Sequence, residues 1–221
     1  SGQENAVQIK QRKNLFRTAA FQDGWFEVQD ISSQLVAKAL APKPGMRVMD
    51  VCAGAGGKTL HLAALMQNKG QLIALDIYEW KLKELKRRAR RAGAHNVETR
   101  LIIAKTIKRL KDGADALLID APCSGLGVLK RNPDAKWKLD QDFIDRITKE
   151  QAEILQTYSK VLRKGGRMVY ATCSILPQEN EQQVEKFLAN NEEYTLITAQ
   201  TLLPHITGND GFYIAVLERR A

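Results

Sequence analysis

Short apolar runs alternate with amphipathic stretches along the chain from about residue 47 onward. This alternation is typical of a parallel sheet whose strands are connected by helices. Six runs are predicted as strands: Arg47–Cys52, Gln71–Asp76, Val97–Ile103, Ala114–Asp120, Arg167–Thr172 and Phe212–Leu217. The stretches between them predict helices over about Lys58–Met66, Glu79–Ala92, Asp142–Leu162 and Glu179–Asn190. The pattern therefore predicts an α/β domain.

Residues 1–40 lie outside this alternation, and the segment Gln8–Arg17 within them is strongly basic. The length of 221 residues suits one sizeable core and is too short for two ordinary domains. We therefore expect residues 1–40 to be an N-terminal extension packed on a catalytic domain of residues 41–221. No apolar run is long enough to span a bilayer and no secretory leader is visible, so we expect no membrane association.

The composition narrows the classes of protein to consider. The formal net charge of +9 suits either a polyanionic partner or only a well-solvated basic surface. Three cysteines, Cys52, Cys123 and Cys173, are too few for a secreted disulfide scaffold and indicate a reducing, cytoplasmic setting. Their spacing matches no zinc pattern and the histidines lie far from them in sequence, so we expect no metal.

A glycine-rich loop follows the first predicted strand and comprises Cys52, Ala53, Gly54, Ala55, Gly56, Gly57 and Lys58. A phosphate-binding P-loop would need glycine at position 52, and a dinucleotide fingerprint starting at Gly54 would need glycine at position 59. The remaining candidate is the shorter loop with which methyltransferases hold the amino-acid part of S-adenosylmethionine. Asp76 ends the second strand, where a carboxylate binds ribose hydroxyls in folds of this class, unless it only caps the next helix.

Two cysteines and an aspartate follow the later strands. Asp120 and Cys123 come after one buried strand, and Cys173 comes after the next. Because the carboxyl ends of parallel strands meet at one edge of a sheet, we expect these residues beside the glycine-rich loop. A thiolate attacks electron-poor carbons, and its addition to carbon 6 of cytosine makes carbon 5 reactive toward a sulfonium methyl group. The alternative is that both cysteines are small buried hydrophobic residues.

The chain resembles the RNA cytosine-5 methyltransferases of the Sun/nucleolar-protein type, most closely the bacterial ribosomal-RNA enzymes, in four ordered segments: DVCAGAGGKT, DAPCSGLGVLKRNPDAKW, YATCSILPQENE and DGFYIAVL. The resemblance covers the chain from about Gly24 to its end. It implies a class I S-adenosylmethionine-dependent methyltransferase fold, which is Rossmann-like, with a seven-stranded, mostly parallel sheet and helices on both faces. It also implies S-adenosyl-L-methionine as the cofactor.

The resemblance further implies roles for individual residues. Cys173 would be the covalent nucleophile, and Cys123 is implicated in release of the methylated product. Asp120 would face both cofactor and base, and Lys58 would lie at the active site. The glycine-rich loop, together with Asp76 and Asp120, would bind the cofactor.

Two positions depart from the pattern of this family. Relatives usually read CAAPGGKT where this chain has Gly54 and Ala55, so the customary proline is missing. The family also usually places an aspartate near the adenine after the third strand, whereas residues 102–106 contain no acid. We expect cofactor binding to survive the first change and adenine recognition to differ in detail.

The partner implied by the resemblance is RNA, with ribosomal RNA favoured over transfer RNA. Two segments in the loop after Cys123 are placed to touch it, Lys130-Arg131-Asn132 and Lys136-Trp137-Lys138, although packing of Trp137 under the loop is an equal alternative. Three other functions stay open. The chain would be a DNA cytosine-5 methyltransferase if Cys123 were the nucleophile, an RNA-binding relative if it binds no cofactor, or a thiol-redox protein if the two cysteines form a disulfide.

Overall fold

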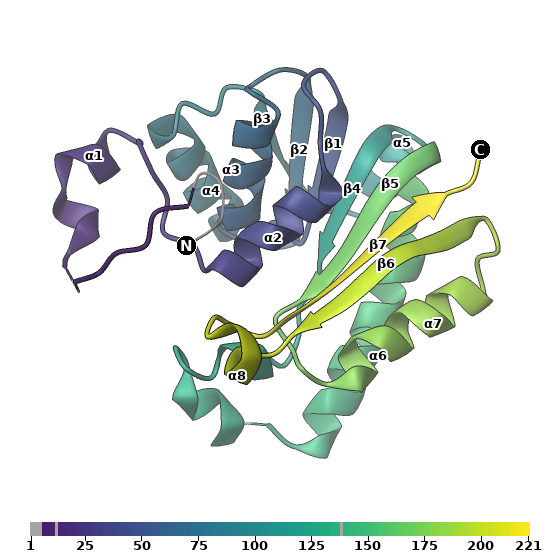
Figure 1. Cartoon of the computed structure of the whole chain (residues 1–221). Coiled ribbons are helices and arrows are strands. Elements are labelled where there is room, and N and C mark those ends of the chain that lie inside the picture. Colours follow the sequence, from purple (N-terminus) through teal and green to yellow (C-terminus); the bar gives the residue numbers. More distant parts are fainter. Residues whose placement is uncertain (1–5, 12, 138) are drawn as a thin grey trace.

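A computed structural model describes residues 6–11, 13–137 and 139–221, and within these ranges seven strands form one sheet in the order β3-β2-β1-β4-β5-β7-β6 (Figure 1). β1 to β5 are parallel to their neighbours among themselves, and β7 is antiparallel to both β5 and β6. The strands are β1 Arg47–Val51, β2 Gln71–Asp76, β3 Val97–Leu101, β4 Ala114–Asp120, β5 Leu162–Thr172, β6 Tyr194–Leu202 and β7 Phe212–Arg219.

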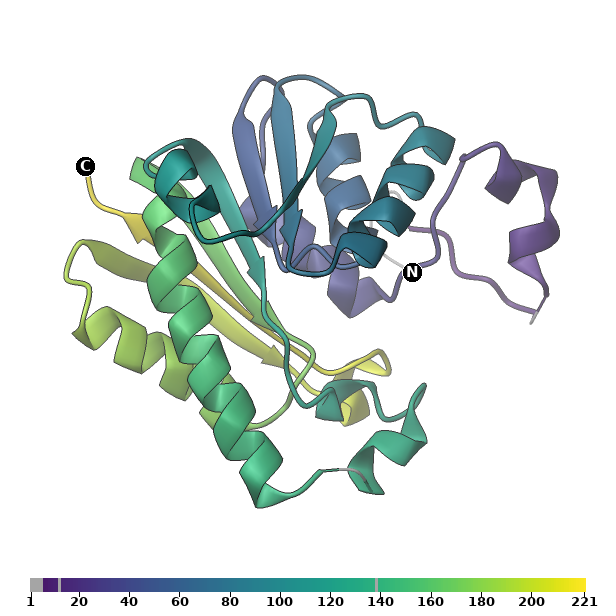
Figure 2. The same ribbon diagram turned by 180° about the vertical axis from the view of Figure 1, so that it is seen from behind.

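Helices cover both faces of this sheet. They are α1 Ala19–Gln22, α2 Ile31–Leu40, α3 Gly57–Leu65, α4 Glu79–Arg91, α5 Thr106–Leu110, α6 Gln141–Tyr158, α7 Glu181–Ala189 and α8 Pro204–Thr207. Buried residues of α2 and α3 pack on one face, and those of α5, α6 and α7 pack on the other. Figure 2 shows the long helix α6 lying along that second face, after the extended connection that leaves β4.

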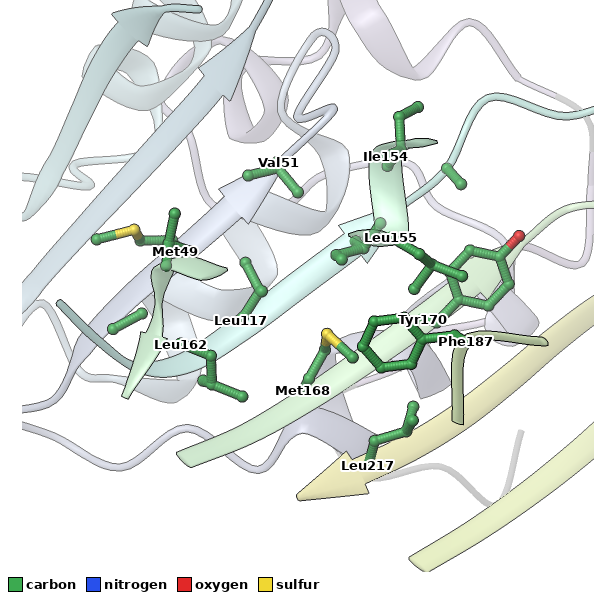
Figure 3. Close-up of a cluster of buried hydrophobic side chains, with 14 of the residues drawn as sticks. Met49, Val51, Leu117, Ile154, Leu155, Leu162, Met168, Tyr170, Phe187 and Leu217 are labelled. Atoms are coloured by element: carbon green, nitrogen blue, oxygen red, sulfur yellow. The ribbon is translucent and has the colours of Figure 1, made fainter. Parts of the chain in front are cut away.

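The alternation of side chains along the strands builds two separate cores. Val48 packs with Leu62 of α3 and Val36 of α2, whereas the next residue, Met49, points to the opposite face. Figure 3 shows this second cluster, in which Met49 lies with Met168 of β5 and helical side chains such as Phe187. Both clusters consist of residues with little or no exposed surface, so the central strands bury apolar side chains on both faces.

The end of α6 differs from its sequence-based prediction. The helix ends at Tyr158 and not at Leu162, because a 3₁₀ turn over Ser159–Val161 leads directly into β5. Leu162 pairs with Ala114, and regular pairing resumes only between Arg167 and Ala116, so residues 163–166 bulge out of the ladder. The predicted strand from Arg167 onward is confirmed. β5 begins earlier, at Leu162, because this residue pairs with Ala114 of β4, which is distant in sequence.

Five of these helices and strands have no counterpart among those predicted individually from the sequence pattern: α1, α2, α5, α8 and β6. The edge strand β6 has mostly exposed side chains from Thr195 onward, so it carries no alternation of buried and exposed residues. α5 has only five residues, which is too short for a helical period to be visible.

The N-terminal residues contact the sheet through α2 and the helix α4 through Glu27. Val36, Ala37 and Leu40 of α2 are fully buried against the sheet. Farther upstream, Glu27 forms ion pairs with two arginines of α4, and the short segment containing α1 loops away from the sheet (Figure 1). Residues 1–5 and 12 of the expected extension lie outside the described residues, and its boundary at residue 40 stays a prediction. No helix in the described part of the chain is long and apolar enough to cross a membrane.

Candidate active site

Two sulfur atoms meet at the carboxyl ends of β4 and β5. The Sγ atoms of Cys123 and Cys173 lie 3.3 Å apart, and both thiols are free. A hydrogen bond from Cys123, aided by the charge of Lys58, lowers the pKa of Cys173 despite burial and the opposing charge of Asp120. The same hydrogen bond and burial raise the pKa of Cys123 well above its usual value. These effects favour a thiolate at Cys173 over one at Cys123.

An ion pair lies beside the cysteines. Lys58, in the first turn of α3, places Nζ 2.7 Å from Oδ2 of Asp120, the last residue of β4. Burial acts to lower the pKa of Lys58, but the charge and hydrogen bond of Asp120 outweigh it and raise the pKa above its ordinary value. The ammonium also lies 5.1 Å from the ring centroid of Phe212, at the start of β7. Lys58 is therefore a fixed positive charge at the site.

The glycine-rich loop turns sharply between β1 and α3. Cys52 and Gly54 both have positive φ angles, and so does Gly56, where a Cβ atom would come within 2.5 Å of Cγ of Leu85. At Gly57 a Cβ atom would meet nothing within 4 Å, so this first residue of α3 borders open space. The first N–H groups of a helix have no acceptors within it. The loop therefore offers unpaired donors and an open approach to a ligand.

Asp76 fixes this loop from the neighbouring strand. Its Oδ2 accepts a hydrogen bond from the Gly54 N–H at 2.9 Å, and its Oδ1 accepts one from the Tyr78 N–H at 2.8 Å. The alternative that Asp76 caps the next helix is wrong, since α4 begins at Glu79 and Tyr78 occupies the N-cap position. Each carboxylate oxygen keeps a second lone pair for a further donor.

A cavity of about 620 Å³ is bordered by Asp76, Asp120 and the first residue of the glycine-rich loop, Cys52. Its lining includes Cys52, Asp76 and Asp120 on one side, Ile77 and Ile102 at the ends of β2 and β3, and residues of α6 opposite them. Burial raises the pKa of the Cys52 thiol, which suits a lining residue and not a nucleophile. No acid follows β3, and Ile102 lines the cavity there. The carboxylates of Glu150 and Glu153 line the cavity from α6.

A family model described as "16S rRNA methyltransferase RsmB/F" matches residues 37–218, which is most of the chain. The chain belongs to the RsmB/F family. Membership confirms the resemblance inferred from the four segments. It also confirms the class I, Rossmann-like methyltransferase fold with a mostly parallel seven-stranded sheet.

Curated RsmB/F relatives are similar along nearly the whole chain. The probable ribosomal RNA small subunit methyltransferase B of Synechocystis sp. is 37% identical over 217 residues, which cover 90% of this chain and 49% of that protein. The ribosomal RNA small subunit methyltransferase B of Pectobacterium carotovorum is 40% identical over 222 residues, covering 96% of this chain and 51% of that protein. The chain thus spans about half the length of these relatives.

Solved structures agree with this assignment. The crystal structure of NSun6 from Pyrococcus horikoshii with SFG, an S-adenosylmethionine analogue, has a TM-score of 0.87 at 30% identity and covers 95% of this chain and 57% of that one. A methyltransferase homolog protein from the same organism has a TM-score of 0.82 at 31% identity, covering 96% of this chain and 73% of that one.

Asp50 is a buried acid beside the RsmB/F glycine loop for which the sequence predicted no role. It has no exposed surface, its Oδ2 accepts a 2.6 Å hydrogen bond from Oγ1 of Thr59, and its Oδ1 has no partner. Burial raises the pKa of Asp50 to about 7, with the charge of Asp120 contributing and the Thr59 hydrogen bond opposing. A carboxyl group that titrates near neutrality therefore lies directly beneath the loop.

Exchanging Asp50 for asparagine is expected to flatten the pH dependence of stability. Because folding raises its pKa from 3.8 to about 7, the folded chain holds a proton that the unfolded chain lacks between these values. The contribution is full at low pH and is lost as the pH rises through about 7, so wild type loses about 2 kcal/mol of unfolding free energy between about pH 5.5 and 8.5. Urea unfolding at both pH values measures this, and an equal loss in Asp50→Asn would contradict the assignment.

A second buried carboxylate was not among the predicted site residues. Glu179 is fully buried, and it accepts hydrogen bonds from Ser124 and Ser174, the residues that directly follow the two cysteines. The only sequence signal was an acid within the YATCSILPQENE segment. Its partners lie up to 55 residues away, so the spacing alone did not reveal it.

The loop between β4 and α6 carries the residues predicted to touch RNA. The alternative that Trp137 packs under the loop is wrong, since its side chain is 80% exposed, with Nζ of Lys136 4.7 Å from its ring centroid. Lys138, the last residue predicted to touch RNA, lies outside the described residues. Arg131 forms an ion pair with the buried Asp210. Among residues 6–11, 13–137 and 139–221, no group of three or more His, Cys, Asp or Glu side chains is placed to hold a metal ion.

Proposed function

We propose that the chain is the catalytic part of an S-adenosylmethionine-dependent enzyme that methylates carbon 5 of cytosine in ribosomal RNA. The observation that carries the proposal is the 3.3 Å approach of two cysteine sulfurs beside the Lys58–Asp120 ion pair. Neither a simple binding module nor a structural domain needs a lowered thiol pKa next to a fixed cation. The three free thiols support a reducing, cytoplasmic setting.

The residues around the cavity fit S-adenosylmethionine. The open first turn of α3 and the loop from Cys52 to Lys58 suit its amino-acid part, and Asp76 suits the ribose hydroxyls. The apolar Ile77 and Ile102 border the same cavity, which suits the flat adenine ring. When bound there, the cofactor supplies an electrophilic methyl group on its sulfonium.

The side chains of the site suit a covalent mechanism. The Cys173 thiolate adds to carbon 6 of cytosine, forming an S–C bond, while the ammonium of Lys58 offsets the negative charge that develops on the ring and Asp120 orients the base. Once carbon 5 carries the methyl group, it loses its proton to a base, and the S–C bond to Cys173 breaks to restore the thiolate. Cys123 holds the proton next to that sulfur, which suits a role in releasing the product.

Two observations support ribosomal RNA as the substrate: the names of the relatives and the exposure of residues around the site. Two relatives are named as ribosomal RNA small subunit methyltransferase B, which supports RNA of the small ribosomal subunit. The exposed ring of Trp137 suits stacking on a base near the site. Because both cysteines are recessed, the target cytosine must leave any base stack to reach them.

The cofactor loop offers one quantitative prediction. Arg88 of α4 donates a 2.8 Å hydrogen bond to the carbonyl of Ala55, at the position where relatives carry proline, and also pairs with Glu27. Arg88→Met is expected to weaken S-adenosylmethionine binding about tenfold, because a charge-assisted hydrogen bond that orders the loop is lost. Isothermal titration calorimetry measures this. The neighbouring Arg87→Met, on a 77% exposed side chain, is the matched control, and equal affinities for both variants would refute the role of Arg88.

The proposed activity is tested with radiolabelled S-adenosylmethionine and unmodified transcripts of small-subunit ribosomal RNA and of transfer RNA. The expected result is label in 5-methylcytidine of the ribosomal transcript after digestion to nucleosides. Label confined to transfer RNA would overturn the proposed substrate. Binding of the cofactor without label in either transcript would overturn the activity proposed for this chain.

A further inference from the structure

Glu179 joins the two cysteine loops from beneath. One of its carboxylate oxygens accepts a hydrogen bond from Oγ of Ser124 at 2.5 Å and one from Oγ of Ser174 at 2.5 Å. The other accepts the Ser124 N–H at 2.8 Å and Nε2 of Gln151 at 3.0 Å. A fully buried carboxylate is stable only when donors surround it in this way. Four donors therefore converge on one side chain, and two of the donating residues directly follow a cysteine.

The serines transmit this anchoring to the cysteines. Each serine oxygen also accepts a backbone N–H two residues farther on, from Leu126 and Leu176, and the two oxygens lie 3.1 Å apart. Adjacent residues cannot move independently, so holding Ser124 and Ser174 on one carboxylate fixes the separation of Cys123 and Cys173. The two loops leave different strands, and they are also joined by the contact of the two hydroxyls, by the contact of the two sulfurs and by the hydrogen bond from the Gly127 N–H to the Cys173 carbonyl.

Glu179 is itself held by contacts that do not involve the cysteines. The hydroxyl of Tyr170 donates to its carbonyl oxygen at 2.8 Å. The next residue, Asn180, accepts a hydrogen bond from Thr172 at 2.6 Å and donates one to the carbonyl of Ser174 at 3.1 Å. The carboxylate is thus a fixed point to which both loops attach.

The negative charge of Glu179 also affects which of the two cysteines ionises. After the hydrogen bond to Cys173, burial and the charge of Cys173, the charge of Glu179 is a further cause that raises the pKa of Cys123. A negative charge near Cys123 disfavours a thiolate there and leaves its proton available to Cys173. The carboxylate thereby favours one of the two possible thiolates.

We propose that Glu179 is a positioning residue that holds the two cysteine loops in register and keeps the shared proton on Cys123, so that Cys173 is the reactive thiolate. The proposal rests on the proposed role of Cys173 as the nucleophile. Its test measures thiol chemistry in the absence of RNA and cofactor, so it does not depend on methylation.

The experiment follows alkylation of Cys123 and Cys173 by iodoacetamide separately, by mass spectrometry of their peptides, between about pH 6 and 9.5. In wild type, Cys173 is expected to react first and with the lower apparent pKa. In Glu179→Gln, the preference for Cys173 is expected to fall at least about tenfold, which corresponds to one pKa unit, as Cys123 becomes easier to ionise. Glu179→Asp keeps the charge with a shorter reach, and we expect it to restore part of the preference.

The matched control is Glu185→Gln, on the exposed side of α7, which is expected to behave as wild type. An unchanged preference and apparent pKa in a folded Glu179→Gln variant would overturn the role of Glu179 while leaving Cys173 as the nucleophile. A wild type without any preference for Cys173 would overturn both proposals. If Glu179→Gln does not fold, Ser124→Ala and Ser174→Ala each remove one link, and unchanged preference in both would equally refute the proposal.

Discussion

Alanine in place of Cys173 is expected to abolish methyl transfer to RNA, by a factor on the order of 10⁴ or more, because the covalent step loses its nucleophile. The thiol has the lowered pKa of the pair and faces the fixed charge of Lys58. The measurement is incorporation of labelled methyl groups under single-turnover conditions. Unchanged S-adenosylmethionine affinity and circular dichroism serve as the control that the variant is folded.

The companion variant Cys123→Ala separates this mechanism from its rival. It keeps the nucleophile but removes the proton donor 3.3 Å away, so a covalent protein–RNA adduct is expected to accumulate and to be visible on denaturing gels. If instead Cys123→Ala abolishes the reaction without an adduct and Cys173→Ala stays active, the nucleophile is Cys123, as in the DNA-type mechanism.

Asparagine in place of Asp120 is expected to lower the methylation rate by about 10² to 10⁴, because the site loses the carboxyl group proposed to face the base. It also leaves the ammonium of Lys58 without its partner, at a cost of up to about 3–5 kcal/mol in stability. Thiol reactivity is expected to change in the opposite direction. The charge of Asp120 raises the pKa of Cys173 against the lowering by Cys123, so its removal leaves Cys173 easier to ionise.

Methylation and alkylation of Asp120→Asn, measured on the same preparation, test this opposition. Glu84→Gln is the control, since Glu84 pairs with Arg87 on the exposed side of α4 and both rates are expected to match wild type. Slower alkylation of Cys173 in Asp120→Asn would contradict the prediction, because it would mean that Asp120 promotes formation of the thiolate.

The central strands were predictable because their apolar runs are local. Ala114–Asp120 is buried on both faces, and its sequence alone predicts the observed strand. β6 was missed because it lies at the edge of the sheet with exposed side chains, and the end of α6 depends on the pairing of Leu162 with Ala114. Propensity and periodicity contain no information about such distant partners.

Some residues of the candidate site were likewise predictable from the sequence, and others were not. Motif spacing places Cys123, Cys173 and Asp120 after adjacent strands, and the structure brings them together at one edge of the sheet. Glu179 and Asp50 were not predicted as site residues. The role of a buried acid depends on hydrogen-bond donors and neighbouring charges that come together only in the folded chain. Their catalytic and structural roles stay proposals that the variants above test.

The backbone around Cys173 has a consequence for synthesis of the protein. The Gly127 N–H donates to the carbonyl of Cys173 at 2.9 Å, and the Gly211 N–H donates to the carbonyl of Gly127 at 2.8 Å, so the start of β7 closes the site. Chains grow from the N-terminus, and β7 enters the sheet between β5 and β6. A nascent chain that ends before Gly211 therefore has both cysteines but an unfinished site. Under the proposed function, the site around Cys173 is therefore completed only after Gly211 and β7 have left the ribosome.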